Sequence, residues 1–490
     1  MKPPTRLRIF TWSSVTVAVA LALSGFAVVA QQSFDRSKIP PPGKPPALHV
    51  PMWTKYSLAN GAQLIVSEKH DLPLISFRIT VQGGTSQLEP ATRRGVASLT
   101  ASMMSEGTKT RDGEAISNAQ QLLGTSISVN VGSENGSLAF QSTTSKFPQT
   151  LDLLADMLVN STFPQDALER LRGQRLVALI QARDQPAAIA TRVFAKILYG
   201  DTHPFGQNVT EESLKAITRE DVVAFHKAYF LPGRALISVV GDVNSASVKA
   251  AVEKSLAGWP RGGVKPVFTY PALPSSHPMT IFLVDKPGAA QSTFAIGNPG
   301  PPRNTPDYDA LQVMNTILGG MFQSRLNANI REEKGYSYGV SSNFAYGKGP
   351  GAFRSGGDMV SAKTDAALVE FMKELRGIGG AKAVSDDELK TAKDSLIQRL
   401  PGTFESVQSI NNALVSLWTQ DLPENYYQQY VSRISAVKKE DVVRVAKQYI
   451  DLEHLTIVIV GDRASIETPL RSTGIAPIAF MDIEGKPAPR

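Results

Sequence analysis

The chain has 490 residues, of which 42% are hydrophobic and 19% are charged, and these proportions exclude a disordered, collagen-like or polytopic membrane protein. Its formal net charge of +7 falls to +4 without Lys2, Arg6 and Arg8, three cations near the N-terminus, and this excess is too small to indicate a nucleic-acid partner. The chain has no cysteine and six separate histidines, which excludes disulfides, thiolate zinc sites and a histidine metal motif on any single element.

The N-terminal segment has the three parts of a secretion signal. A basic start precedes an apolar run from Val15 to Val29 and a small-residue exit at Ala30, so we expect a signal peptide over 1–30. The alternative is an uncleaved membrane anchor, because the apolar stretch approaches the about 20 residues that span a bilayer. Both readings predict an exported protein, in the periplasm or anchored to the membrane. The Pro-rich residues 31–50 predict an extended spacer.

Hydrophobic periodicity predicts alternating strands and helices in residues 51–260. We expect strands at 63–67 and 75–81, and a hairpin of 126–131 with 137–143 around Asn135-Gly136. The helices expected in this half cover 97–105, 113–123, 147–158, 165–182, 186–198 and 211–229. The Gly- and Pro-rich stretch that follows predicts a linker over 261–280.

The second half, 281–465, repeats this order. We expect a strand at 291–296, a helix opened by Thr305-Pro306-Asp307, a strand pair within 336–353, and a C-terminal tail at 466–490. The other helices expected in this half cover 321–333, 364–375, 386–400, 407–417 and 439–449.

An internal repeat explains this parallel. Residues 220–242 recur 220 positions later as 440–462, and ten of these 23 aligned positions are identical. A period this long indicates a duplicated domain rather than a solenoid. The sequence therefore predicts an α+β protein of two homologous domains, each with a mainly antiparallel sheet covered by helices.

Two signatures in this framework carry a family resemblance. The first is Arg94-Gly95-Val96-Ala97 with Gly107-Thr108-Lys109, and the second runs from Gly319-Gly320 through Ser324-Arg325-Leu326 to 331–338, Arg-Glu-Glu-Lys-Gly-Tyr-Ser-Tyr. With the duplication, they resemble the insulinase, pitrilysin and mitochondrial-processing-peptidase family, the inverzincins. The resemblance covers about residues 50–465 and implies a peptidase fold.

In that family, zinc is bound by an H-x-x-E-H helix, with a glutamate from a later helix as the third ligand. At the matching positions this chain has Ser98, Ala101 and Ser102, and its later helix, 173–183, has no acid. Serine hydroxyls are poor zinc ligands, and alanine cannot act as a base. The resemblance therefore implies a degenerate motif, with no metal or other cofactor in this chain and none of its residues catalytic in isolation.

The replacement serines raise the alternative of a serine hydrolase. No histidine or lysine lies within a turn of Ser98 or Ser102, so a general base is missing and we favour packed helix positions. An active zinc peptidase with unusual ligands is opposed by the missing histidine spacing. The lone His203, which precedes Pro204 in a loop, we interpret as structural.

A second set of family residues is present. The resemblance implies that Arg331 and Tyr338, seven residues apart, bind the substrate backbone and the developing oxyanion. A guanidinium and a phenol are donors suited to that role. The alternative is that Arg331 pairs with Glu332 or Glu333 at a solvated helix end and that Tyr338 packs in a sheet.

We therefore expect a zinc-free subunit of a heteromeric zinc metallopeptidase. Its partner is a homologous chain with H-x-x-E-H, which holds the zinc, and its substrate is an extended peptide added as a strand to a sheet edge. The alternative function is a non-enzymatic peptide-binding or assembly scaffold with an inactive peptidase fold. Nucleic acid is not an expected partner, and the membrane is one only if the leader stays uncleaved.

Overall fold

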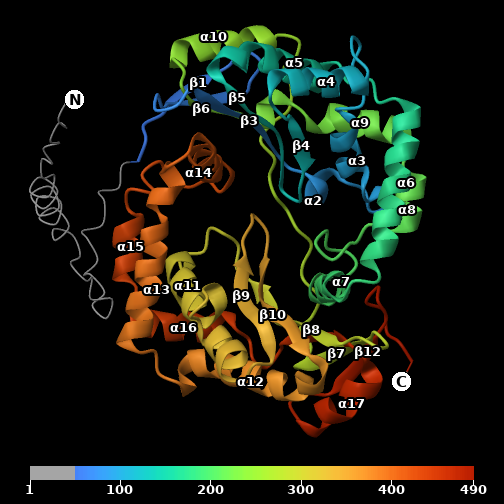
Figure 1. Cartoon of the computed structure of the whole chain (residues 1–490), viewed down its shortest axis with the longest axis vertical. Coiled ribbons are helices and arrows are strands. Elements are labelled where there is room, and N and C mark those ends of the chain that lie inside the picture. Colours follow the sequence, from blue (N-terminus) through green and yellow to red (C-terminus); the bar gives the residue numbers. More distant parts are fainter. Residues whose placement is uncertain (1–49, 490) are drawn as a thin grey trace, which may run out of the picture. The chain divides into compact units, whose positions relative to one another are not determined.

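The computed structural model describes residues 50–489. The predicted signal peptide and nearly all of the spacer lie outside these residues. The predicted duplication is seen as two six-stranded sheets, and helices cover both (Figure 1). In the described part of the chain, no helix has the length and apolar character that a membrane crossing requires.

The first sheet has the strand order β1-β2-β6-β3-β5-β4. Neighbouring strands are antiparallel except β2 and β6, which pair in parallel. The strands are β1 (Thr54–Ser57), β2 (Gln63–Glu68), β3 (Leu74–Gln82), β4 (Ser128–Val131), β5 (Asn135–Thr143) and β6 (Ala235–Gly241). The helices of this half are α2 (Thr85–Leu88), α3 (Val96–Met103), α4 (Gly113–Leu123), α5 (Phe147–Val159), α6 (Gln165–Ala182), α7 (Pro186–Tyr199), α8 (Glu211–Ala216), α9 (Arg219–Tyr229) and α10 (Ser245–Ser255).

The second sheet has the order β12-β7-β11-β8-β10-β9, which repeats the first except at its outer strand. Its strands are β7 (Thr280–Asp285), β8 (Gln291–Gly300), β9 (Ser337–Ala345), β10 (Gly351–Val360), β11 (Thr456–Gly461) and β12 (Ile478–Met481). The helices are α11 (Tyr308–Asn315), α12 (Thr364–Arg376), α13 (Asp386–Arg399), α14 (Val407–Thr419), α15 (Tyr430–Ala436), α16 (Lys439–Tyr449) and α17 (Arg463–Ser472). Three π-helical turns cover Thr316–Gly320, Asn327–Glu333 and Gly377–Ala381.

The segment 466–490, predicted above to be a tail, is instead part of the second half. It contains most of α17, and β12 pairs in parallel with β7 at the edge of the sheet. Ile466 and Leu470 are buried in the core of this half. The second sheet therefore takes its outer strand from the C-terminus, whereas the first sheet takes β1 from the start of the described chain.

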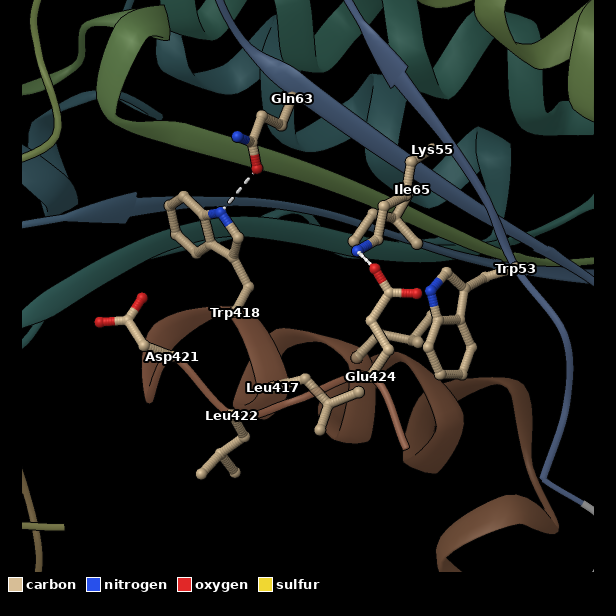
Figure 2. A pocket seen from close by; sticks show the side chains of 10 residues that line it. Trp53, Lys55, Gln63, Ile65, Leu417, Trp418, Asp421, Leu422 and Glu424 are labelled. Atoms are coloured by element: carbon tan, nitrogen blue, oxygen red, sulfur yellow. Dashed lines mark hydrogen bonds and ion pairs between the residues drawn. The ribbon is translucent and has the colours of Figure 1, made fainter. Parts of the chain in front are cut away.

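Each sheet has one face covered by a helix of the other half. The helix α7 packs Val193 and Phe194 against the second sheet, where they join Ala295 and Val458 in one buried cluster. In the same way, α14 packs Leu414 against Leu236 of the first sheet. The central strands are buried on both faces, so each sheet needs an apolar cover on its second side. This exchange ties the two halves together, and Trp418 of α14 also donates to the Gln63 side chain of β2 at 2.8 Å (Figure 2).

Three local predictions differ from the structure. The first hairpin turns at 132–134, before Asn135-Gly136, because Gly136 is already in β5, where a side chain would meet the Tyr229 hydroxyl 2.6 Å from its Cβ. The predicted helix 211–229 is two helices, since the Thr218 side chain caps a new one and accepts from the Asp221 amide at 3.2 Å.

The predicted helix 321–333 is largely replaced by the π-helix Asn327–Glu333. The Asn327 side chain donates to the Phe322 carbonyl at 3.0 Å and accepts from the Val340 amide at 3.1 Å. Such side-chain bonds to the backbone compete with regular helical bonding. They also fix the π-helix against β9, the edge strand that carries Tyr338.

Candidate functional site

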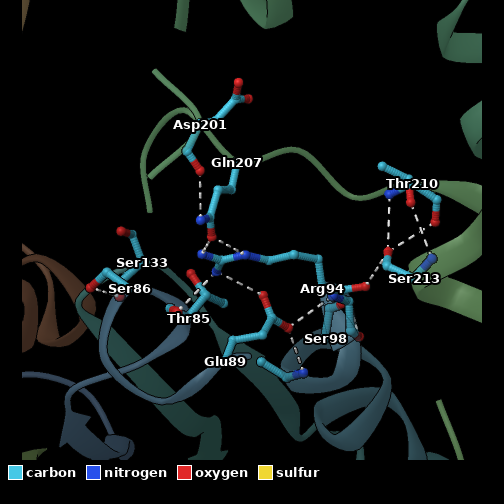
Figure 3. Close-up of polar contacts among 12 residues, drawn as sticks. Thr85, Ser86, Glu89, Arg94, Ser98, Ser133, Asp201, Gln207, Thr210 and Ser213 are labelled. Atoms are coloured by element: carbon cyan, nitrogen blue, oxygen red, sulfur yellow. Dashed lines mark hydrogen bonds and ion pairs between the residues drawn. The ribbon is translucent and has the colours of Figure 1, made fainter. Parts of the chain in front are cut away.

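The degenerate motif lies on α3, and a buried carboxylate caps the beginning of this helix. Glu89 Oε1 accepts from the backbone amides of Gly95 and Ala97, both at 2.9 Å. The other oxygen, Oε2, accepts from Arg94 Nη1 at 3.3 Å (Figure 3). A negative charge here satisfies amides that a helix leaves without partners and complements the helix dipole.

The same network fixes the chain before α3. Arg94 also donates to the Thr85 carbonyl at 3.1 Å and to Gln207 Oε1 at 3.0 Å (Figure 3). Gly95 has a φ of +104°, where other residues are strained, and a Cβ on it would lie 2.7 Å from Leu214. The signature Arg94-Gly95 is thus explained by the geometry at this helix end.

The motif positions themselves are engaged in packing and local hydrogen bonds. Ala101 is buried, and the Ser98 hydroxyl donates to the Gly95 carbonyl at 3.0 Å. The guanidinium of Arg175, from α6, donates to Ser102 Oγ at 2.8 Å and to the Ser98 carbonyl at 3.3 Å. A fixed cation therefore lies against the two serines.

These residues do not fit a zinc ion. They present two hydroxyls, a methyl group and a guanidinium, whereas zinc takes imidazole, thiolate or carboxylate ligands. A permanent cation within hydrogen-bond distance of Ser102 also repels a metal cation. Across residues 50–489, no cluster of three or more His, Cys, Asp or Glu side chains is arranged to hold a metal.

Arg331 lies in the π-helix Asn327–Glu333 and is half-buried. Its Nη1 lies 3.2 Å from Glu332 Oε1, and its guanidinium carbon lies 4.2 Å from the centre of the Phe322 ring. This ion pair agrees with the alternative in which Arg331 pairs with a neighbouring glutamate at a helix end. The stacking on Phe322 is an additional contact, and it orients the guanidinium without using its N–H donors.

Tyr338 is near the start of β9 and does not pack in the sheet. Its side chain is 92% exposed, and among the described residues its hydroxyl has no hydrogen-bond partner. Gly335, with a φ of +66°, lets the chain turn from the π-helix into this strand. The phenol therefore projects from an edge strand into solvent.

The structure does not connect the two predicted sites by direct contact. Within residues 50–489, no hydrogen bond, ion pair or ring contact joins Arg331 or Tyr338 to Ser98, Ala101 or Ser102. The degenerate motif lies in the first half, among the helices that cover its sheet. The Arg331–Tyr338 pair lies in the second half, at the edge of its sheet.

His203 is buried in an aromatic stack. Its ring centre lies 5.1 Å from that of Tyr199 and 5.5 Å from that of Tyr270, and its Nδ1 accepts from the Phe205 amide at 3.2 Å. Burial lowers the pKa of His203. This surrounding is typical of a neutral, structural histidine.

Two residues at the site were not singled out from the sequence. Arg175 lies in the helix from which a third zinc ligand is expected, so a basic residue in the acid-free segment 173–183 was the available signal. Glu89 carried no comparable signal, because its role as a cap depends on a loop between α2 and α3.

Comparisons with known proteins agree with the resemblance. Residues 64–204 match the family model described as insulinase (peptidase family M16), and 216–396 match the model described as peptidase M16 inactive domain. A solved structure of a peptidase M16 inactive domain from Pseudomonas fluorescens superimposes with a TM-score of 0.77 at 26% identity, covering 84% of this chain and 98% of that one.

Two relatives of similar likeness have names that differ. The non-peptidase homolog YmxG of Helicobacter pylori is 24% identical over 403 residues, which cover 82% of this chain and 92% of the relative. The uncharacterized zinc protease YmxG of Bacillus subtilis is 24% identical over 360 residues, which cover 73% and 86%. Activity must therefore be argued from the residues of this chain.

Proposed function

The chain belongs to peptidase family M16, the insulinase family, and we propose that it acts there as a zinc-free subunit of a two-chain metallopeptidase. In this proposal, zinc lies in a homologous partner chain that carries H-x-x-E-H. The present chain contributes Arg331 and Tyr338 to that site, and the substrate is an extended peptide.

The contact of Arg175 with Ser102 supports the zinc-free part of the proposal. A guanidinium that donates to Ser102 Oγ at 2.8 Å takes the space and the positive charge that a metal would bring. The fold of the first half is thus compatible with its degenerate motif. The capped α3 serves as scaffold, which leaves catalysis to another chain.

The exposure of Tyr338 is the observation that carries the catalytic part. A phenol that is 92% exposed contributes little to folding, so packing does not explain it. With the guanidinium of Arg331 oriented by Phe322, the second half presents two kinds of hydrogen-bond donor. Donors of this kind stabilise the oxyanion that forms when water attacks a peptide carbonyl.

A non-enzymatic scaffold is the second candidate function. The Arg331–Glu332 ion pair favours it, because an arginine with a carboxylate partner needs no substrate to explain it. The two functions differ in what the donors do. In a scaffold, removal of the Tyr338 hydroxyl leaves the turnover of a peptidase complex unchanged.

The test uses the complex of the full chain with its H-x-x-E-H partner, co-purified from the native cells. We expect Arg331→Ala and Tyr338→Phe each to lower kcat for peptide hydrolysis by roughly 10²–10³-fold while the complex stays intact. Glu333→Ala is the control, since this exposed residue pairs with Lys334 and its loss costs at most about 1 kcal/mol. Wild-type turnover in both variants rejects the catalytic role and leaves the scaffold function.

We further propose that the subunit works outside the cytoplasm, as the basic, apolar and small-residue order of residues 1–30 predicts. The mass of the mature protein from the periplasmic fraction tests this. Loss of 1–30 supports cleavage, the full mass in the membrane fraction supports the anchor, and recovery from the cytoplasm contradicts both.

A further inference from the structure

A cavity of about 750 Å³ opens in the first half between the α5–α6 connection and helix α9. It is separate from the motif and from the Arg331–Tyr338 pair. Apolar side chains form much of its wall, among them Val159, Phe163, Val223, Phe230, Leu231 and Trp259. Three basic side chains, Lys109, Arg219 and Lys227, line it as well, and no Asp or Glu does.

The duplication shows that this cavity is particular to the first half. Helix α9 corresponds to α16, so Val223 and Lys227 correspond to Val443 and Lys447. In the second half, the connection between α12 and α13 is longer, and its turn Gly377–Ala381 packs on α16 against those two side chains. The shorter connection in the first half, 160–164, leaves the same face of α9 open.

The wall of the cavity is held in a strained conformation. Phe163 has a φ of +52°, which is uncommon for an aromatic residue. Arg219 keeps this turn in place, because its Nε donates to the Phe163 carbonyl and its Nη2 to the Thr162 carbonyl, both at 2.7 Å. Backbone strain that persists under such restraint is typical of functional sites.

The positive charges that line the cavity have few partners among the described residues. In the described part of the chain, neither Lys109 nor Lys227 has a carboxylate within ion-pair distance. The third nitrogen of Arg219, Nη1, likewise has no partner among residues 50–489. His226 adds no charge, because burial lowers its pKa to about 4 and its Nε2 bonds to the Leu158 carbonyl at 2.9 Å.

We infer that this cavity binds an organic carboxylate that carries an apolar chain. The carboxylate pairs with Lys109 and Lys227, and the apolar chain lies among Phe163, Phe230 and Trp259. The combination of a cationic rim without acids and an apolar wall selects for this chemistry, since an inorganic anion gains nothing from the wall and a neutral lipid gains nothing from the lysines.

Calorimetric titration of the full chain with decanoate tests this binding. Decylamine, with the same chain and the opposite charge, is the matched control ligand. A peptide that ends in Leu is titrated in two forms, one with a free C-terminal carboxylate and one with a C-terminal amide. These peptides show whether the natural carboxylate belongs to a free acid or to a peptide terminus. Saturable binding of decanoate or of the acid peptide, with none of decylamine or the amide, supports the inference and identifies the source.

Two variants assign the binding to this cavity. Lys109→Gln/Lys227→Gln removes two exposed cations without disturbing the core, and we expect affinity for the carboxylate to fall at least about tenfold. Lys447→Gln, at the matching position of the covered helix α16, is expected to leave affinity unchanged. Val223→Trp fills the cavity and is expected to abolish binding while circular dichroism stays native. Equal binding of decylamine, no binding of either carboxylate, or unchanged affinity in the double variant overturns the inference.

Discussion

The motif region of the first half and the Arg331–Tyr338 region of the second half differ in how their polar groups are used. In the first, Glu89, Arg94 and Arg175 bond to backbone and side-chain atoms of the same half. In the second, the Tyr338 side chain is 92% exposed. Groups satisfied inside a half serve its folding, whereas an exposed donor is available to another molecule. The comparison therefore separates a region whose polar groups are bonded internally from a region that leaves a donor exposed.

The largest expected effect is the loss of stability in Glu89→Ala. The change leaves the Arg94 charge buried without its partner and the Gly95 and Ala97 amides without their acceptor. We expect a loss of about 3–5 kcal/mol in the free energy of unfolding, measured by urea denaturation. Glu332→Ala is the matched control, because Glu332 is an exposed partner of the half-buried Arg331 and the loss of this pair costs about 0–1 kcal/mol. Equal losses in the two variants contradict this difference between the two regions.

A second test concerns metal. We expect the purified chain to retain no stoichiometric zinc after dialysis and to cleave no peptide alone, as checked by elemental analysis and a peptidase assay. A tight zinc ion in each wild-type chain contradicts this.

A sharper form of the metal test places histidines at both serine positions. Ser98→His/Ser102→His supplies two imidazoles one turn apart. We expect zinc affinity to rise at least about tenfold when Arg175→Ala is added, because the nearby cation is removed. Arg170→Ala is the control, since that residue pairs with Glu106 instead. Equal affinity with and without Arg175 means that this cation does not oppose a metal.

The second half contains a partly buried ion pair between Arg325 and Glu388. This pair predicts that stability falls in acid. Burial of Glu388 acts to raise its pKa, but the Arg325 guanidinium and the Ser385 amide outweigh it and lower the pKa of Glu388 to about 2. The folded form thus binds its proton more weakly than the unfolded chain. The stabilisation is complete above about pH 4.5 and is lost as the pH falls toward 2.

We expect this acid-dependent loss to be about 1–2 kcal/mol, after allowance for solvent screening of a partly exposed carboxylate. The comparison of wild type with Glu388→Gln by denaturation between pH 7 and pH 3 measures it, and the variant should show the shallower pH dependence. Parallel curves for the two proteins contradict the prediction.

The smallest expected effect is that of Tyr338→Phe on stability. Tyr338→Phe removes only a hydroxyl that lies in solvent, so the free energy of unfolding should change by less than about 0.5 kcal/mol. Tyr229→Phe is the contrasting control, because its buried hydroxyl donates to the Val81 carbonyl at 2.8 Å. A Tyr338→Phe loss as large as that of Tyr229→Phe means that Tyr338 is structural.

Much of the fold follows from the sequence. The repeat of 220–242 at 440–462 predicts the duplication, and the helices 113–123, 165–182 and 439–449 begin and end where hydrophobic periodicity places them. The lost zinc ligands are also read directly, since Ser98, Ala101 and Ser102 occupy the motif whatever surrounds them. Local spacing determines the helices, because helix periods depend on residues a few positions apart.

The tertiary structure decided which distant surfaces meet. It placed Arg175 against Ser102, covered each sheet with a helix of the other half, and added β12 to the second sheet. The sequence predicts the helices 186–198 and 407–417 but not the surface that each one covers, because burial of apolar surface has no direction of its own. Shape and the connections between elements select the partner, and these exist only in the folded chain.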